Sequence, residues 1–346
     1  MINNNLLNLD WLFESPYWEG PDINQFEVIN ISDGLIHRIE NRLKSYVPNG
    51  KKILFVRPHE IYTPEPVLDL LHSFLEKHNI QDATIVLNNY YVQEDLTKLP
   101  TMNIVWCDYF LLYTEFLHRV FGQRHNLKFN PNADKDFRLV IGKPDKPNRA
   151  NLLVELHSQR LLDNSYASIL CEDKYLKKLS QHTVYNDEFS YNALSQYNKS
   201  IDNIEFTQLD NLNLHCQGYP YDETKFTESK VSIIPETTSY DHFFITEKTY
   251  YAIYNNHPFV ICSTPGTLAE LRKLGYKTFD SVIDESYDLC DDIVRRMKMV
   301  GRSADQLLNE IHNPLVKEIV NYNYELFASK VASEIIWIEK QLRKIQ

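Results

Sequence analysis

The first third of the chain alternates short apolar runs with amphipathic stretches. The run KKILFVRP at 51–58 predicts a buried strand, and PEPVLDLLHSFLEKHN after it has the apolar spacing of a helix with proline in its first turn. Further apolar runs at 82–89 and 102–110 predict two more strands, and 114–124 predicts another helix. Strands that alternate with helices in this way pair in parallel, so we expect an α/β layer here.

A polar stretch, KFNPNADKD at 128–136, interrupts this pattern and predicts a domain boundary. A second α/β series follows it, in which NRANLLVELHSQRLLD at 148–163 has the clearest helical spacing. The Asn- and Tyr-rich region 180–229 gives no regular pattern. The strands that we predict in this series are 137–144, 166–171, 231–238, 257–263 and 277–281.

Residues 315–345 keep a helical pattern over their whole length, which spans roughly 45 Å at 1.5 Å per residue. A helix of this length is able to cross from a second domain back to a first. We therefore expect an α/β protein with two Rossmann-like domains, 1–130 and 131–313, facing a cleft, and a long C-terminal helix at 314–346. In doubly wound sheets of this kind, ligands bind outside the carboxyl ends of the strands.

Composition and charge narrow the class of protein. A hydrophobic content of 43% and a charged content of 24% are ordinary for a globular protein that buries its own core. The five cysteines form no C-x-x-C pair, and the start MINNNLLNLDW lacks the pattern of a signal peptide, so we expect a cytoplasmic location. No segment approaches ~20 apolar residues, the length that spans a membrane. The net charge of −11 disfavours nucleic acid as a partner, because nucleic-acid-binding surfaces are basic.

The stretch DHFFITEKTYYAIYNNHPFVICSTPGT at 241–267 joins a helix start to an apolar strand that ends in a small-residue turn. Thr246 is suited to be the N-cap of this helix, and Glu247 complements the helix dipole as a first-turn acid. Lys248 opposes the same dipole, but its charge is favourable if an anion binds between the ammonium and the first N–H groups of the helix. A capped helix and an anion site both remain open interpretations at this point.

A second cation stands at a predicted helix start in GKPDKPNRANLLVELHSQRLLD, 142–163. Arg149 follows a predicted strand and a proline-containing loop. Its simplest role is that of a surface side chain paired with Asp145 or Glu155. Two strand–loop–helix units that each place a cation at the helix start also fit one shared anion, and a diphosphate suits the pair.

These two segments resemble the donor-binding stretches of the α-1,3-fucosyltransferase family. Arg149 stands in a P-x-R sequence that is similar to the start of that family's arginine-bearing helix. The resemblance covers about residues 140–290 and does not extend through the first domain. The residues of the second segment that match the family pattern are Phe244, Ile245, Thr246, Glu247, Lys248, Pro258, Val260, Ser263 and Gly266.

The resemblance implies an inverting GT-B glycosyltransferase that needs no metal or other cofactor and binds a nucleotide-sugar donor in its C-terminal domain. The acceptor would be a saccharide or another hydroxyl compound, on the side of the N-terminal domain. The family's Gly-containing turn before T-E-K is absent here, so the resemblance does not assign the nucleotide as GDP. The donor-site residues that it implies are Arg149 and Lys248 for the diphosphate, Glu247 for the ribose, Phe244 near the base, and Thr246, Ser263 and Gly266 around them.

Inverting transfer also needs a carboxylate that takes the acceptor's proton. Glu60 follows ILFVRP in RPHEIYTPEP, and Asp108 follows IVW in WCDYF, so both are expected at the carboxyl edge of the first sheet. Glu60 is the first candidate and Asp108 the second. Glu14, in FESPYWE, resembles a family motif around a catalytic glutamate but precedes the first predicted strand. Each of the three has the alternative role of a surface or capping acid.

Other functions share the same donor motifs and remain open. They are a glycosyltransferase acting on a modified DNA base, a sugar-nucleotide epimerase or hydrolase, and a non-catalytic module that binds a sugar nucleotide or a glycan. The chain contains no G-x-S-x-G, no Walker lysine loop and no G-x-G-x-x-G. The usual hydrolase, NTPase and NAD-binding interpretations therefore have no support.

Acids and histidines elsewhere do not predict a metal site. Asp134 and Asp136 precede a strand, whereas a metal-binding acid pair of a glycosyltransferase should follow one, so we interpret them as part of a solvated linker. The histidines that lack metal-ligand spacing are His215, His242 and His257. A helix predicted at 286–300 carries in its exposed first turn Asp288, Asp291 and Asp292.

Overall fold

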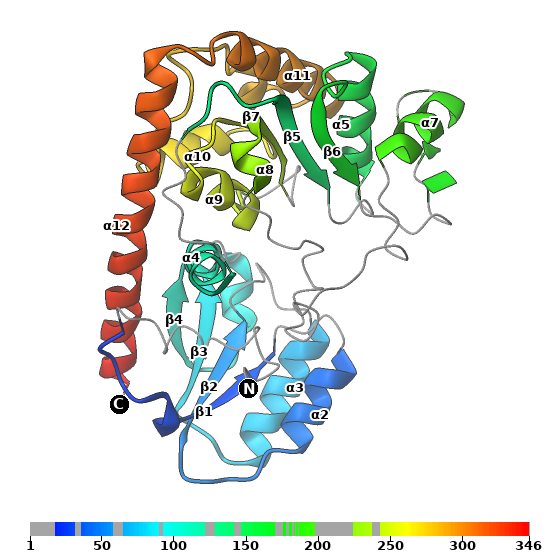
Figure 1. Cartoon of the computed structure of the whole chain (residues 1–346). Coiled ribbons are helices and arrows are strands. Elements are labelled where there is room, and N and C mark those ends of the chain that lie inside the picture. Colours follow the sequence, from blue (N-terminus) through cyan, green and yellow to red (C-terminus); the bar gives the residue numbers. More distant parts are fainter. Residues whose placement is uncertain are drawn as a thin grey trace. The chain divides into compact units, whose positions relative to one another are not determined.

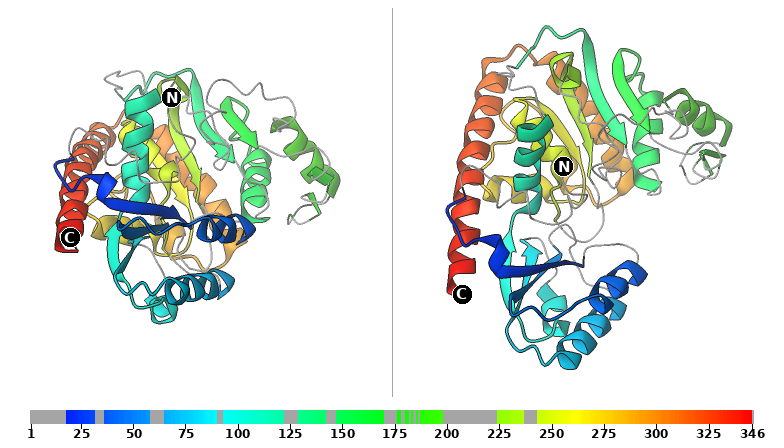
Figure 2. Two further views of the ribbon diagram at one scale, coloured as in Figure 1. Left: turned by 90° about the horizontal axis from the view of Figure 1, so that it is seen from below. Right: turned by 60° about the horizontal axis from the view of Figure 1, so that its bottom comes forward.

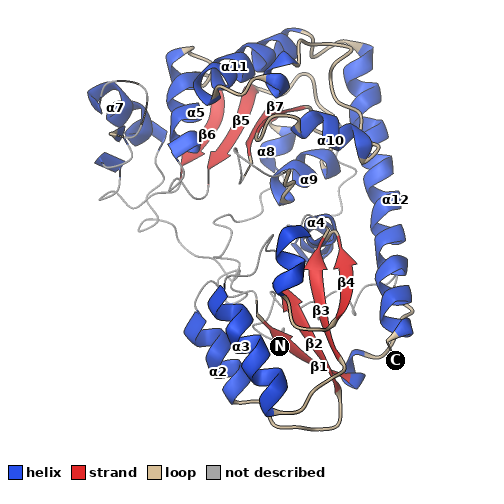
Figure 3. Cartoon of the chain, turned by 180° about the vertical axis from the view of Figure 1, so that it is seen from behind, coloured by secondary structure: helices blue, strands red, loops and turns tan. Residues whose placement is uncertain are grey.

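The computed structural model of the chain contains two compact units. It describes residues 18–31, 36–57, 65–89, 93–121, 129–141, 147–169, 176–177, 180–181, 183, 185, 187–197, 224–236 and 243–345. The first unit combines 1–116 with 329–346, and the second comprises 117–328. Each unit contains a four-stranded parallel sheet, coloured red in Figure 3, so the expected α/β class is confirmed.

The first unit is built on a sheet with the strand order β1-β2-β3-β4. Each strand pairs in parallel with the next one along the chain. The strands are β1 (Phe26–Asn30), β2 (Lys52–Arg57), β3 (Ala83–Asn88) and β4 (Asn103–Cys107). The connecting and following helices are η1 (Ile23–Gln25), α2 (Ile36–Lys44), α3 (Glu65–Lys77), η2 (Gln93–Lys98) and α4 (Tyr109–Phe121).

The core of the first unit explains why its strands appear in the sequence as continuous apolar runs. All six residues of β3 are buried, which is typical of a parallel strand covered on both faces. Helices α2 and α3 pack side by side (Figure 1), and Ile39 of α2 and Leu71 of α3 are fully buried. Phe55 of β2 lies in the same core cluster and contacts Phe74 edge to face, with ring centroids 5.8 Å apart.

The second unit is built on a sheet with the strand order β6-β5-β7-β8. All three neighbouring pairs are parallel. The strands are β5 (Lys135–Ile141), β6 (Ser165–Ile169), β7 (Ser229–Pro235) and β8 (Phe259–Cys262). The helices are α5 (Pro147–Ser158), α7 (Asp187–Tyr197), α8 (Thr224–Thr227), α9 (Glu247–Tyr254), α10 (Thr267–Lys273), η6 (Ser286–Leu289) and α11 (Ile293–Asn309).

The strand order of the second sheet contains a topological switch point. The chain passes from β5 to β6 on one side, and later adds β7 on the other side of β5 and β8 beyond it. Crossovers between parallel strands are right-handed, so connections that run in opposite directions place their helices, α5 and α9, on opposite faces. The carboxyl ends of β5 and β7 therefore flank the position where doubly wound sheets bind ligands.

Helix α12 (Pro314–Lys344) is the long C-terminal helix that the sequence predicts, and both views of Figure 2 show it unbroken. Its residues up to Ala328 belong to the second unit and those from Ser329 to the first. In the second unit, the Asn323 amide donates to the carbonyl of Lys277 and accepts from its N–H, both at 2.8 Å. In the first unit, the Gln341 amide pairs in the same way with Trp106 at 3.0 Å.

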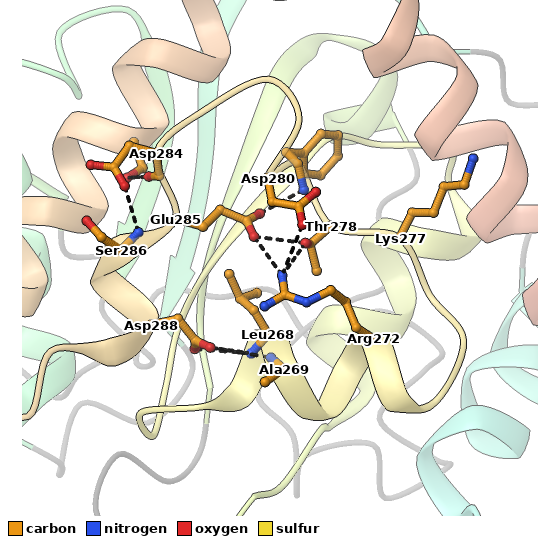
Figure 4. Close-up of polar contacts among 12 residues, drawn as sticks. Leu268, Ala269, Arg272, Lys277, Thr278, Asp280, Asp284, Glu285, Ser286 and Asp288 are labelled. Carbon is orange, nitrogen blue, oxygen red and sulfur yellow. Dashed lines mark hydrogen bonds and ion pairs between the residues drawn. The ribbon is translucent and has the colours of Figure 1, made fainter.

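Some local predictions are wrong. Residues 277–281 form no strand: the side chains of Asn323 and Glu285, and not a neighbouring strand, bind the backbone groups of Lys277 and Phe279. The Glu285 carboxylate accepts from the Phe279 N–H at 2.7 Å and from the Thr278 hydroxyl at 2.8 Å, and it pairs with Arg272 at 3.0 Å (Figure 4). The sequence also did not predict β1 or α2, and the strand expected at 102–110 ends at Cys107, where Asp108 leads into α4.

None of the helices in the described part of the chain combines the length and the apolar character needed to cross a membrane.

Candidate functional site

The start of α9 has the cap that the sequence predicts. Thr246 is the N-cap residue, and its hydroxyl accepts from the Lys248 N–H at 3.4 Å. This hydroxyl satisfies one of the N–H groups that a helix start leaves without an intrahelical partner. Phe244 and Ile245, which lead into the helix, are buried, as are Thr246 and Glu247.

A buried carboxylate fixes this helix start to the end of β7. Glu236 follows the last residue of the strand and has no exposed surface. Its side chain accepts from the Thr246 N–H at 3.1 Å, the Thr246 hydroxyl at 2.6 Å and the Thr249 hydroxyl at 2.7 Å. Negative charge at a helix N-terminus complements the dipole, and hydrogen bonds offset the cost of burying it. Sequence reasoning missed Glu236, although an acid directly after an apolar strand was a usable signal.

The ammonium group of Lys248 lies over the first turn of α9. It donates to the Thr246 hydroxyl at 3.0 Å and to the Glu247 carboxylate at 3.1 Å. The Lys248 and Glu247 side chains are 19% and 9% exposed. The predicted cation is therefore present at the helix start, held among oxygen atoms of its own chain and close to the N–H groups of the first turn.

Arg149 lies in the first turn of α5 and is only 4% exposed, so it is not the surface side chain of the simpler sequence interpretation. Glu155, one of its two suggested partners, accepts from Gln159 at 2.8 Å and from the Tyr185 hydroxyl at 2.5 Å. The other, Asp145, lies outside the described residues. Because α5 follows β5 and α9 follows β7, Arg149 and Lys248 both belong to helix starts that flank the switch point.

The turn after β8 is closed by the chain itself. Gly266 has a φ of 82°, a left-handed conformation that favours glycine, and it is the N-cap of α10. The N–H of Leu268 donates to the Asp288 carboxylate at 3.1 Å, and the N–H of Ala269 at 3.4 Å (Figure 4). Burial raises the pKa of Asp288, while these hydrogen bonds act in the opposite direction.

The prediction for Asp288 is therefore wrong. The residue is buried in the 3-10 helix η6 instead of being an exposed acid of a helix at 286–300. Helix α11 begins at Ile293, and Asp292 is its N-cap, with its carboxylate accepting from the Arg295 N–H at 2.6 Å. The predicted helix start was too early because the three acids do not share one first turn. Asp288 accepts from N–H groups at the start of α10, Asp292 caps α11, and Asp291 lies between η6 and α11.

A buried arginine that the sequence did not single out supports the same turn. Arg296 is 2% exposed, and its guanidinium donates to the carbonyl of Ser263, to that of Cys290 at 2.7 Å and to that of Asp291 at 3.2 Å. Ser263 is itself buried. The guanidinium therefore adds positive charge behind the carboxyl end of β8.

The carboxyl edge of the first sheet is also polar. The last residues of three neighbouring strands, Asn30, Arg57 and Asn88, are all buried. The Arg57 guanidinium donates to the carbonyl of Ile31 at 2.5 Å. Polar side chains at buried strand ends are uncommon in parallel sheets, whose strands are largely apolar.

Asp108 lies at this edge, directly after β4. Its carboxylate accepts from the Leu111 N–H at 3.2 Å, so it caps α4. Its own N–H donates to the Glu334 carboxylate of α12 at 2.7 Å. The structure thus joins a predicted candidate to a second carboxyl group, Glu334, that local sequence patterns could not reveal.

Several predicted residues lie outside the described part of the chain. They are the first base candidate, Glu60, the third candidate, Glu14, and three residues of the stretch that stands in place of the family's Gly-containing turn, Tyr240, Asp241 and His242. Among the residues that are described, no group of three His, Cys, Asp or Glu side chains is arranged to hold a metal ion.

The two edges have different chemistry. The second sheet has cation-bearing helix starts on both sides of its switch point, suited to an anion, whereas the first has a pair of carboxyl groups, suited to proton transfer. No protein-family model, no curated protein and no solved structure matches this chain. The likeness to the fucosyltransferase family therefore remains a resemblance of motifs.

Proposed function

We propose that the protein is a glycosyltransferase that moves a sugar from a nucleotide-sugar donor to a hydroxyl acceptor, with inversion and without a metal ion. The observation that carries the proposal is the placement of Arg149 and Lys248 in the first turns of the helices after β5 and β7, on either side of the switch point. That is where open α/β sheets bind ligands, and helix starts favour anions.

In this proposal, Arg149 and Lys248 bind the donor diphosphate and stabilise the charge that it gains as it leaves. Glu247 holds the ribose hydroxyls, as the family resemblance implies, and Phe244 lies near the base. Thr246, with Ser263 and Gly266 of the turn after β8, completes the donor site. The two-domain GT-B arrangement and a cytoplasmic location belong to the same proposal.

The chemistry requires one proton acceptor. The acceptor oxygen forms a bond to the anomeric carbon, and the bond from that carbon to the diphosphate oxygen breaks. The electron pair of the broken bond leaves with the nucleoside diphosphate, and the acceptor's proton passes to a carboxylate. Glu60 and Asp108 are the candidates that the sequence supplies for this role.

The first test is calorimetric titration of the whole protein with GDP, UDP, dTDP and CMP, followed by turnover of the corresponding sugar nucleotides. We expect micromolar binding of at least one diphosphate, and turnover that EDTA does not change. Binding without turnover on any acceptor would favour the non-catalytic module, and transfer only to modified DNA would favour the DNA-base enzyme. Absence of binding to every nucleotide would exclude the proposal.

A further inference from the structure

Helix α12 carries most of the exposed large hydrophobic side chains. Among the described residues, nine such side chains are exposed, and five of them lie on this one helix. Single hydrophobic residues scattered over a surface are normal, whereas several gathered on one face mark an interaction site. The five are Leu315, Tyr322, Tyr324, Ile336 and Trp337, with exposed fractions from 36% to 48%.

Three of these side chains follow a seven-residue repeat. Tyr322 comes 7 residues after Leu315, Ile336 comes 14 residues after Tyr322, and the exposed Ser329 fills the position between them. This repeat keeps residues on one side of a helix that pairs with a second helix in a left-handed supercoil. Because α12 is one unbroken helix, the spacing follows from helix geometry alone. We call these four residues the α12 seam.

Tyr322 is held in a fixed position on the seam. Its hydroxyl donates to the carbonyl of Gly275 at 3.3 Å, and the Lys277 ammonium lies 4.7 Å from the centroid of its ring. The same ammonium pairs with Glu318 at 2.7 Å, while the Glu318 side chain stays 61% exposed. A side chain that is already ordered loses little conformational entropy when a partner binds, so Tyr322 is suited to anchor a contact.

The charges beside the seam change sign at Ser329. Exposed Glu318 and Glu325 each stand three residues after a seam residue, and exposed Lys340 stands four residues after Ile336. Residues three or four apart share one face of a helix, so these charges lie next to the seam. Two copies of the helix in parallel would set like charges against each other, whereas an antiparallel pair sets acids against cations.

We propose that the α12 seam is the interface of a symmetric antiparallel dimer, in which the α12 helices of two copies pack together with the two-fold axis at Ser329. In a two-fold interface, each residue faces the one that lies equally far on the other side of the axis. Tyr322 then faces Ile336 of the partner subunit, and Glu318 faces Lys340 of the partner subunit. The small side chain of Ser329 lets the two helices approach closely at the axis.

A second copy of the chain fits the seam because the seam is complementary to itself. One register brings together both the apolar pair and the charged pair, and the symmetry makes each contact twice. Trp337, beside the seam, faces the exposed Asn321 of the partner subunit in the same register and adds an aromatic contact of the kind enriched in interfaces. The inference does not depend on the proposed transferase function.

The test measures the mass of the whole protein by analytical ultracentrifugation as its concentration rises. We expect the wild type to pass from 40.8 kDa toward twice that mass. Glu318→Lys and Lys340→Glu should each raise the Kd of the dimer by about tenfold, because each creates two like-charge pairs. An equimolar mixture of the two variants should regain the wild-type Kd, because each variant supplies the charge that the other needs.

Two further variants separate the seam from other surfaces. Ile336→Asp should raise the Kd by about 100-fold, because it removes the apolar contact with Tyr322 twice in each dimer. The matched control is Lys298→Glu, a charge reversal at an exposed position of α11, which should leave the Kd unchanged.

A wild type that stays monomeric at every concentration would overturn the inference. So would a dimer that survives Ile336→Asp, or a mixture of Glu318→Lys and Lys340→Glu that associates no more tightly than either variant alone.

Discussion

The two sheets of this protein have the same number of strands and the same parallel pairing, but they differ in order. The first adds its strands consecutively, β1-β2-β3-β4, whereas the second reverses direction between β5 and β7. Their carboxyl edges differ too. Three strands of the first end in buried polar residues. The strands of the second end in Ile141, Ile169, Pro235 and Cys262, and β7 and β8 are followed directly by the buried polar residues Glu236 and Ser263.

The difference in strand order goes together with a difference in the groups that line the two carboxyl edges. In the second unit, diverging connections leave helix starts on both sides of the switch point, and a buried carboxylate, Glu236, secures one of them. In the first unit, the described strands follow one another in a single direction across the sheet, so their order contains no switch point. Glu334 of α12 adds a carboxyl group next to Asp108 at the carboxyl edge of this sheet. The second edge thus has two cation-bearing helix starts, whereas the first has two neighbouring carboxyl groups.

Removal of Glu236 should produce the largest effect. Glu236→Ala leaves the Thr246 N–H and two threonine hydroxyls without their buried acceptor, so we expect the free energy of unfolding of the second unit to fall by about 4 kcal/mol. Asp108→Ala, which removes a cap with one N–H contact in the first unit, should cost about 1 kcal/mol. Denaturant unfolding measures both, and equal losses would contradict this difference between the two units.

The two units should respond to pH in opposite directions. In the second, His257 is buried, and burial lowers its pKa from 6.5 to about 4. Its ring lies against Phe226 and is bonded to Ser229 and Ser232 oxygens. Because the folded pKa lies below the unfolded value, stability is full above pH 6.5 and falls toward pH 4, by about 3 kcal/mol at 1.36 kcal/mol per unit. Raised pKa values at Glu285 and Asp288 act against this trend at the acid end.

In the first unit, the pKa of Glu334 is raised from 4.5 to about 7, so its contribution is full below pH 4.5 and is lost as the pH rises through 7. Hydrogen exchange resolved by segment, corrected for intrinsic rates, should show β2 and β3 less protected at pH 7 than at pH 5, and β7 and β8 more protected. Glu334→Gln should remove the trend in the first unit alone. Parallel trends in both units would refute this assignment.

Lys248→Ala and Arg149→Ala should each weaken nucleoside diphosphate binding by 10- to 100-fold, about 2 kcal/mol, because each removes a charge-assisted contact of the proposed donor site. The matched control is Lys273→Ala, whose side chain is 71% exposed and pairs with Glu270 on the surface of α10. Calorimetry with the diphosphate that binds the wild type is the measurement. If neither variant changes the affinity, the switch point of the second sheet is not the donor site.

The smallest effect is expected at the turn after β8. Gly266→Ala introduces a side chain where φ is 82°, and since no atom lies within 4 Å of the added Cβ, the cost is backbone strain of about 1 kcal/mol. Thermal unfolding should show a small decrease in Tm. A much larger loss would mean that the turn is packed more tightly than its geometry indicates.

Much of the fold could be predicted from the sequence, for a physical reason. Buried parallel strands such as β2, β3 and β7 are continuous apolar runs, and α12 keeps its period over its full length. The strand FEVIN of β1 was missed because only part of it is buried at this edge position. The sheet order could not be read, because pairing between β5 and β7 depends on contacts between distant parts of the chain.

The same limit applies to the candidate site. Thr246 was predicted to be an N-cap because capping depends on residues that are close in sequence. The structure confirms that it is the N-cap of α9. Glu334 could not be found, since its partner Asp108 is 226 residues away and nothing in the helical pattern of α12 distinguishes one partly buried acid from another. Arg296 was indistinguishable from its neighbour Arg295 until packing placed one of them in the interior.

The contacts of α12 with β4 also bear on solubility. As the outermost strand of its sheet, β4 would otherwise offer a row of backbone groups to which a strand from another molecule could add. Gln341 engages the N–H and the carbonyl of Trp106, and Glu334 engages the N–H just beyond the strand. These residues of α12 thereby block the addition of a strand from another molecule to β4. A protein that is truncated before Ser329 would lose this protection, and we expect it to aggregate through β4.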